Sequence, residues 1–144
     1  MQLSIVIPLF NEQDSLTELT ESIQSIILSQ DLEYEIILID DGSTDKSWSI
    51  IKNICSKHSN IKGLRFLRNF GKSQALSAGF KLCKGEVVIT MDADLQDDPN
   101  EIPDLYKKIA IDGFDLVSGW KKKRYDSFIF KNFPSKIFNW AARK

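Results

Sequence analysis

Asp92 and Asp94 are separated by a single residue and directly follow an apolar run at residues 87–91. In extended backbone, alternate side chains point the same way, so both carboxylates can approach one ion. Hard oxygen ligands of this kind suit Mg²⁺ or Mn²⁺, which proteins hold through one or two carboxylates together with substrate phosphates. Gln96 can add a neutral oxygen, and the small Ala93 leaves room for a ligand near the backbone. The spacing therefore predicts a divalent-metal site in this loop.

The same loop has a second interpretation, in which its charges serve only the local fold. Asp97 and Asp98 precede Pro99, which suits the first turn of a helix, and negative charge is favourable at a helix N-terminus. This interpretation explains these two aspartates well. It explains Asp92 and Asp94 less well, because a solvated turn does not need two carboxylates at the exit of a buried strand.

Asp40 and Asp41 form a second acidic corner, at the end of the apolar run 34–39. Gly42 permits a tight turn with positive φ, and a turn followed by a helix cap explains residues 42–45. It does not explain the paired aspartates. A carboxylate here can accept hydrogen bonds from a nucleobase or a ribose hydroxyl, which is the interpretation favoured for Asp40.

Short apolar runs alternate with helical patterns along the chain. The runs are continuous in Ile, Val and Leu, which is typical of strands buried on both faces, and they occupy residues 3–9, 34–39, 61–67, 87–91 and 115–118. The helical patterns occupy residues 15–30, about 45–59, 73–84 and 99–113, and the first begins with Ser15 and Glu18 placed for a capping box. This alternation predicts an α/β fold with three layers, an open and mostly parallel sheet with helices on both faces. In such sheets, ligands bind at the carboxyl ends of the strands, where the strand order reverses.

Composition and charge set the limits of the molecule. The 144 residues, 42% of them hydrophobic, suffice for one compact domain, and the net charge of −1 does not favour a nucleic-acid partner. The charge is uneven: residues 1–119 carry 11 Lys and Arg against 19 Asp and Glu, whereas residues 120–144 carry 8 against 1. We therefore expect an α/β domain at 1–119 and a basic amphipathic segment at 120–144. No run is long enough to span a bilayer.

Four motifs in this order, IVIPLFNE, IDDGSTD, RNFGKSQALSAG and MDADLQD, resemble the inverting glycosyltransferases of family 2, which have the GT-A fold. The resemblance covers essentially the whole chain and is greatest for the dolichyl-phosphate mannosyltransferase-like subgroup, which glycosylates polyprenyl phosphates. It implies transfer from a UDP- or GDP-sugar to undecaprenyl or dolichyl phosphate with Mg²⁺ or Mn²⁺, at the cytoplasmic face of the membrane. The family's catalytic domain normally continues further, so we expect the N-terminal part of a longer protein.

The resemblance also implies roles for single residues. The nucleotide pocket comprises residues in the loops that follow the strands: Pro8, Phe10, Glu12, Asp40, Asp41, Asn69, Lys72, Asp92 and Ala93. Asp92, Asp94 and Gln96 are implied to hold the metal, with Asp92 and Asp94 as catalytic residues. Lys121 and Arg124 match two arginines that grip the acceptor phosphate, although Lys in place of Arg loses the bidentate geometry.

The sequence is also compatible with other functions and partners. Phe and Trp mixed with basic residues in 127–144 suit a helix lying on anionic lipid, but also a helix covering the sheet or a contact in a homo-oligomer. The rival functions are a metal-dependent nucleotide-binding fragment without activity and a family 2 transferase acting on a hydroxyl acceptor. An Asp-nucleophile phosphatase would need a further acidic metal loop, and a dinucleotide-dependent oxidoreductase would need a glycine-rich turn after the first strand. The base and sugar of the donor are not predicted.

Overall fold

The structure is a computed structural model and describes residues 1–119. The predicted basic segment at 120–144, with Lys121 and Arg124, lies outside the described residues. In the described part, strands and helices alternate as the sequence predicts. The elements are β1 (Leu3–Leu9), α1 (Leu16–Leu28), β2 (Tyr34–Asp40), α2 (Ser47–Lys57), β3 (Ile61–Arg65), α3 (Lys72–Phe80), β4 (Val87–Thr90), a 3-10 turn (Pro99–Glu101) and α4 (Ile102–Ala110).

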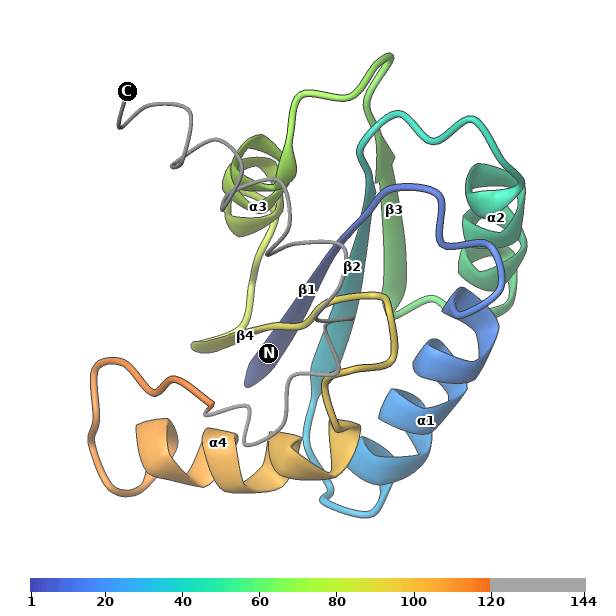
Figure 1. The fold of residues 1–144 in the computed structure, drawn as a ribbon. Helices are drawn as coiled ribbons and strands as arrows, with labels where there is room; N and C mark the ends of the chain where they lie inside the picture. The colour runs from blue at the N-terminus through green and yellow to red at the C-terminus, as the bar shows by residue number, and fades with distance from the viewer. Residues whose placement is uncertain (120–144) are drawn as a thin grey trace, which may run out of the picture.

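The strands form one sheet in the order β3-β2-β1-β4, and every pair in it is parallel (Figure 1). The chain adds β2 and β3 on one side of β1 and then returns to place β4 on the other side. The strand order therefore reverses between β1 and β4, which is where a ligand site is expected in a parallel sheet. The prediction of an open parallel α/β sheet is confirmed.

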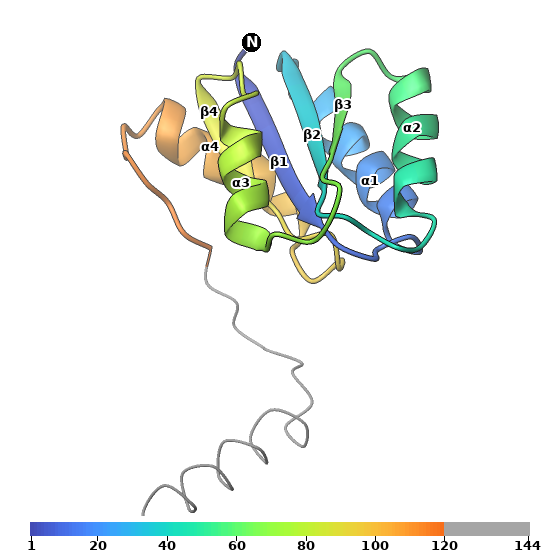
Figure 2. The same cartoon turned by 90° about the horizontal axis from the view of Figure 1, so that it is seen from above.

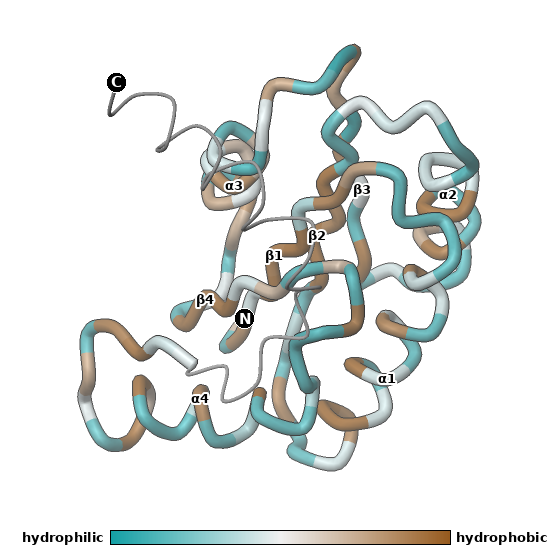
Figure 3. The backbone as a smooth tube through the Cα atoms, in the orientation of Figure 1, coloured by the Kyte–Doolittle hydropathy of each residue, from teal (hydrophilic) through white to brown (hydrophobic). Residues whose placement is uncertain are grey.

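Helices cover both faces of the sheet, with α3 on one face and α1, α2 and α4 on the other (Figure 2). The larger core cluster lies on the face of the three helices and includes Ile5, Ile7, Leu38 and Ile89. The smaller cluster lies under α3 and comprises Val6, Ile37, Ile39 and Ala75. The apolar strands and polar loops can be followed in Figure 3. Every residue of β1 is buried, which explains why its sequence is apolar without alternation.

Gly79 lets α3 lie close against the sheet. A Cβ atom at this position would lie 2.4 Å from Cδ1 of Ile39 and 2.5 Å from Cγ1 of Val6, so no larger residue fits without movement. This close contact fixes the helix over β1 and β2. Its first residue, Lys72, consequently lies next to the carboxyl ends of the central strands.

Two predictions of local structure are wrong, and two elements end earlier than predicted: the strand expected at 61–67 ends at Arg65, and the helix expected at 73–84 ends at Phe80. Residues 115–118 form no strand in the described chain, and Leu116 is 85% exposed. A run of four residues makes too few ladder hydrogen bonds to form a strand without a neighbouring strand to pair with. The capping box is also absent, because Ser15 has helical φ and ψ angles and its hydroxyl donates to the carbonyl of Glu12. No helix within residues 1–119 is long and apolar enough to cross a bilayer.

Candidate nucleotide and metal site

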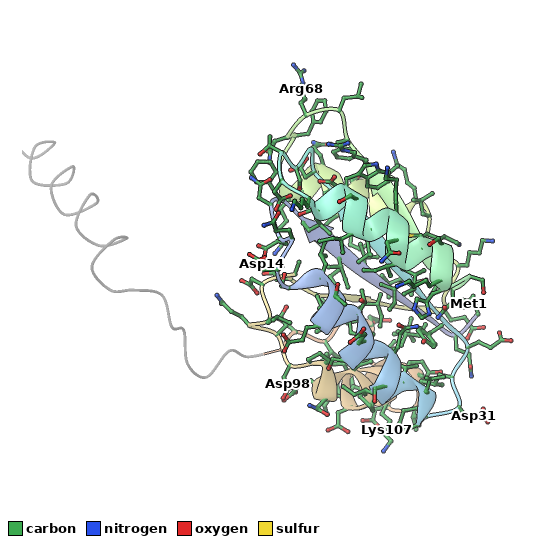
Figure 4. All side chains as sticks on the ribbon, turned by 90° about the vertical axis from the view of Figure 1, so that its right-hand side faces the viewer. Met1, Asp14, Asp31, Arg68, Asp98 and Lys107 are labelled. Atoms are coloured by element: carbon green, nitrogen blue, oxygen red, sulfur yellow. The ribbon has the colours of Figure 1, made fainter. Side chains whose placement is uncertain are left out.

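A cavity of about 430 Å³ opens at the carboxyl ends of β1 and β4, beside the first turn of α3. This end of the sheet carries Asp14 and Asp98, whereas Met1 and Asp31 lie at the opposite end (Figure 4). The cavity is lined by Pro8, Leu9, Phe10, Glu12, Asp41, Asn69, Gly71, Lys72, Ala75, Asp92, Ala93 and Asp94. The structure thus brings together the predicted nucleotide and metal residues, with the exceptions of Asp40 and Gln96.

Asp41 joins the loop after β2 to the loop after β3. Its Oδ1 accepts the backbone N–H of Phe70 at 2.8 Å, and its Oδ2 accepts that of Gly71 at 2.8 Å. The side chain is almost completely buried but still borders the cavity. Because each carboxylate oxygen has two lone pairs, one acceptor position per oxygen stays available to a ligand.

Asp40 is fully buried and does not line the cavity. Its Oδ1 accepts the backbone N–H of Ser43 at 2.8 Å, and its Oδ2 lies 3.3 Å from Nε of Arg65. These contacts hold the turn after β2. In the described structure, Asp40 therefore supports the loop, while the neighbouring Asp41 faces the ligand space.

Hydrogen bonds join the loop after β1 to the loop after β2 and to the first residue of α2, and leave Phe10 and Glu12 in the cavity lining. The backbone N–H of Asn11 donates to Oγ of Ser43 at 2.9 Å, and the N–H of Glu12 donates to Oγ of Ser47 at 2.9 Å. Asn11 has φ of +58°, a conformation that few non-glycine residues adopt. The turn places Phe10, which is 43% exposed, where its ring can stack on a planar ligand.

The acidic loop after β4 is ordered by its own side chains. Asp97 accepts the backbone N–H of Asp92 at 2.9 Å, and Asp94 accepts that of Gln96 at 3.1 Å. Asp92 also contacts the ammonium of Lys72 from the first turn of α3. Asp97 therefore helps to order the loop itself.

Asp98 caps the 3-10 turn at Pro99–Glu101, as the sequence predicts. Its Oδ1 accepts the backbone N–H of Asn100 at 2.9 Å. Hydrogen bonds from the backbone and the side chain of Asn100 hold the pKa of Asp98 below its ordinary value. The capping interpretation is thus confirmed for Asp98.

The donor set suits a divalent cation that is completed by a ligand. Within residues 1–119, no group of three or more His, Cys, Asp or Glu side chains gathers in range of one metal ion. Asp92 and Asp94 nevertheless line one cavity, and Asp94 is exposed with lone pairs beyond the one that Gln96 uses. Two carboxylates with the remaining positions supplied by phosphates and water are a common arrangement for Mg²⁺. The Gln96 side chain does not reach the cavity lining.

Sequence reasoning missed three lining residues, namely Leu9, Gly71 and Ala75. The position of Ala75 carries a usable signal, because it follows Lys72 by three residues and so lies on the same side of α3. Leu9 is almost fully buried, and Gly71 has no side chain. Nothing in their residue types points to a ligand.

The sequence model described as Glycosyl transferase family 2 matches residues 4–143. Undecaprenyl-phosphate 4-deoxy-4-formamido-L-arabinose transferase of Pseudomonas fluorescens (strain SBW25) is 43% identical over 142 residues, which are 98% of this chain and 41% of that protein. The protein of the same name from Shewanella sediminis is 42% identical over 98% of this chain and 42% of its own length. The chain thus spans about two fifths of the length of these relatives.

Solved structures show the same fold. Mannosyltransferase PcManGT from Pyrobaculum calidifontis, in complex with GDP-Man and Mn²⁺, has a TM-score of 0.62 at 23% identity over 76% of this chain and 32% of that one. S. aureus TarS 1-349 in complex with UDP-GlcNAc also has a TM-score of 0.62 at 23% identity, over 85% of this chain and 39% of its own. These likenesses bear out the GT-A fold. Because the family model matches residues 4–143, which are almost the whole chain, the chain belongs to glycosyl transferase family 2.

Proposed function

We propose that the chain is the nucleotide-sugar-binding part of a metal-dependent, inverting glycosyltransferase that moves a sugar from a UDP- or GDP-sugar to a polyprenyl phosphate. The observation that carries this proposal is the convergence of Asp41, Asp92 and Asp94 on one cavity where the strand order reverses. The names of the relatives, which specify undecaprenyl phosphate, support the acceptor class.

The donor's nucleoside is proposed to occupy the part of the cavity between the loops after β1 and β2. Phe10 offers an apolar ring for stacking, and Asp41 offers acceptor positions for the N–H groups of a base. Glu12 lies in the same lining and can accept from a ribose hydroxyl. Asn69 and Lys72 extend the lining toward the phosphates, where the ammonium of Lys72 can pair with negative charge.

Asp92 and Asp94 would hold a Mg²⁺ or Mn²⁺ ion, with Gln96 as a further oxygen ligand after a change in loop conformation. When bound, such an ion stabilises the charge that grows on the departing diphosphate. Through such an ion, the two aspartates would orient the diphosphate. The buried Ala93 between them keeps the backbone close to the ligand.

The acceptor sets what else the protein must supply. A lipid phosphate arrives as an anion, so it needs cations that position it and no general base to deprotonate it. Lys121 and Arg124 are the proposed cations, and the basic stretch 120–144 is the proposed contact with the cytoplasmic face of the membrane. Both lie outside the described residues.

Titration calorimetry with UDP, GDP and their sugars, with and without Mn²⁺, tests the donor site. Binding that requires Mn²⁺ is the expected result, and equal affinity without the metal would contradict the proposed metal role. Single-turnover transfer to a polyprenyl phosphate then tests the reaction. The same assay with a hydroxyl acceptor tests the rival transferase reaction, which predicts transfer to the hydroxyl and none to the lipid phosphate.

A second candidate is a nucleotide-binding module that does not complete the transfer by itself. The observation that favours it is the coverage of about two fifths of the relatives' length. This candidate predicts metal-dependent nucleotide binding without transfer by the 144-residue chain. Transfer by the 144-residue chain in the single-turnover assay would exclude this candidate.

A further inference from the structure

Arg65 lies at the end of β3, opposite Asp40 in the register of the parallel sheet. The Asp40 side chain is fully buried, and its Oδ2 has no hydrogen bond within the described part of the chain. The Arg65 Nε atom lies 3.3 Å from that oxygen and brings a positive charge against it. A buried carboxylate without a nearby cation is strongly unfavourable, so Arg65 makes the burial of Asp40 possible.

The same guanidinium makes a second polar contact. Its Nη2 donates to the backbone carbonyl of Ser43 at 3.0 Å, while Asp40 accepts the backbone N–H of Ser43. The ion pair thus holds both polar backbone groups of one residue. The guanidinium also lies over the ring of Trp48, 5.8 Å from its centroid. A planar guanidinium can bond two acceptors in a fixed geometry, whereas an ammonium is a single point charge.

Ser43 connects this ion pair to the cavity. Its Oγ accepts the backbone N–H of Asn11, whose positive φ needs support from its surroundings. Asn11 stands between Phe10 and Glu12, and both of these line the cavity. Loosening Ser43 would therefore weaken one of the hydrogen bonds that tie this loop to residues 43–47, the one at Asn11 between the two proposed nucleoside contacts.

We propose that Arg65 is a positioning residue for nucleotide binding, acting through Asp40 and Ser43 on the loop after β1. Arg65 does not line the cavity itself. This inference rests on the proposed function, because it assumes that the cavity holds the nucleotide. The expected effect of Arg65 on the loop after β1, however, applies to the ligand-free protein as well.

A matched ion pair lies at the other end of the sheet. Lys62 of β3 lies with Nζ 2.6 Å from Oε2 of Glu35 at the start of β2. The two carboxylate side chains are 0% and 1% exposed, and the cations Arg65 and Lys62 are 43% and 40% exposed. Lys62→Gln therefore removes the cation from a buried carboxylate as Arg65→Gln does, but away from the cavity.

The test compares Arg65→Lys, Arg65→Gln and Lys62→Gln by thermal unfolding, Mn²⁺-dependent nucleotide affinity and amide hydrogen exchange. Arg65→Gln removes the charge beside Asp40 and should lower the melting temperature. Arg65→Lys keeps this charge, so its melting temperature should lie close to that of the parent. It cannot also hold the Ser43 carbonyl, so nucleotide affinity should fall about tenfold, the size expected for one lost hydrogen bond to a charged group. Lys62→Gln should lower the melting temperature and keep the affinity.

Parent-like affinity and parent-like exchange of the Asn11 amide in Arg65→Lys would overturn the proposal, because Arg65 would then act only as a counter-charge. A parent chain that binds no nucleotide would refute the proposed function instead. In that case, hydrogen exchange of the Asn11 amide in the ligand-free protein tests the role of Arg65 by itself. About tenfold faster exchange in Arg65→Lys than in Lys62→Gln would support the inference. Equal exchange rates in the two variants would overturn it.

Discussion

The ammonium of Lys72 contacts Oδ1 of Asp92, and this ion pair joins the first turn of α3 to the acidic loop after β4. In the free protein, a side-chain cation thus occupies one of the oxygens proposed for the metal. The two side chains are 59% and 35% exposed, so the pair is solvent-screened and easily exchanged. A divalent ion at this oxygen of Asp92 would compete with the ammonium, which would then be available to the proposed diphosphate.

Lys72→Met should therefore raise the affinity for Mn²⁺ alone and lower the affinity for nucleoside diphosphate. Removing a competing exposed cation should strengthen metal binding by roughly two- to fivefold, the range of an exposed ion pair. Free and bound Mn²⁺ can be counted by electron paramagnetic resonance. Lys81→Met, just past the other end of α3, is the matched control and should change neither affinity. Weaker Mn²⁺ binding by Lys72→Met would show that the lysine assists the metal instead.

Asp94→Asn should abolish the Mn²⁺-dependent part of nucleotide affinity and leave the circular dichroism spectrum intact. The side chain is exposed and keeps its shape, so only the charge that binds the metal is lost. Asp98→Asn is the control, because Asn also caps a helical turn and Asp98 does not line the cavity. Equal affinities in Asp94→Asn and in the parent would remove Asp94 from the site.

Glu35→Gln should flatten the acid dependence of stability. Burial by itself raises the pKa of Glu35, but hydrogen bonds from Lys62, Ser4 and the backbone of Lys84 outweigh it and hold the pKa below 4.5. The ionised form therefore favours the folded state, with a contribution that is complete above pH 4.5 and is lost as the pH falls through the folded-state pKa.

Thermal melts between pH 7 and pH 3 measure this effect. Glu35→Gln should cost about 1–3 kcal/mol near pH 7 and lose less than the parent on acidification. Glu33→Gln, in which the altered side chain is 77% exposed, should keep the acid dependence of the parent. Parallel curves for Glu35→Gln and the parent would contradict the assignment.

Gly42→Ala should be more damaging than Gly113→Ala. Both glycines have nearly the same positive φ, +77° and +76°, so both replacements bear the same backbone strain of about 1 kcal/mol. A Cβ at Gly42 would also lie 2.4 Å from the carbonyl carbon of Arg68, whereas one at Gly113 meets nothing within 4 Å. Denaturant titration should show an additional loss of about 1–3 kcal/mol for Gly42→Ala, with weaker nucleotide binding. Equal losses of stability in the two variants would mean that the loops after β2 and β3 move apart without cost to accept the Cβ.

Lys121, Lys123 and Arg124 changed together to Gln should weaken sedimentation with anionic liposomes, because each basic residue near the surface contributes about 1 kcal/mol. The control changes Lys46, Lys52 and Lys57 to Gln, which removes the same charge from the region of α2. A similar loss in both variants would indicate that only net charge matters, and unchanged sedimentation of the first would reject the lipid contact.

The sequence predicts the sheet well where a strand is buried on both faces, because its residues must then all be apolar or paired. β1 has the predicted bounds of 3–9, because only a strand buried on both faces needs a continuous apolar run. The convergence of Phe10, Asp41 and Asp92 follows from the same reasoning, since parallel strands end at a common edge.

The sequence could not show which of two adjacent aspartates faces the ligand. Successive side chains of a strand point to opposite faces, so the answer depends on the residue at which the strand ends. The apolar run ends at Ile39, but the ladder continues through Asp40, which pairs with Leu9 and Arg65. Asp40 is consequently buried toward Arg65, and Asp41 becomes the cavity residue.

The cavity is assembled from segments that are distant in sequence, with Leu9 in one and Asp94 in another. These segments meet only when the parallel register is complete, so unfolding the sheet destroys the binding surface as a whole. Any nucleotide that binds there will consequently protect the entire domain against heat, by about 2.7 kcal/mol at a free concentration one hundred times the Kd. A rising melting temperature during ligand titration would thus report on affinity without any assay of sugar transfer.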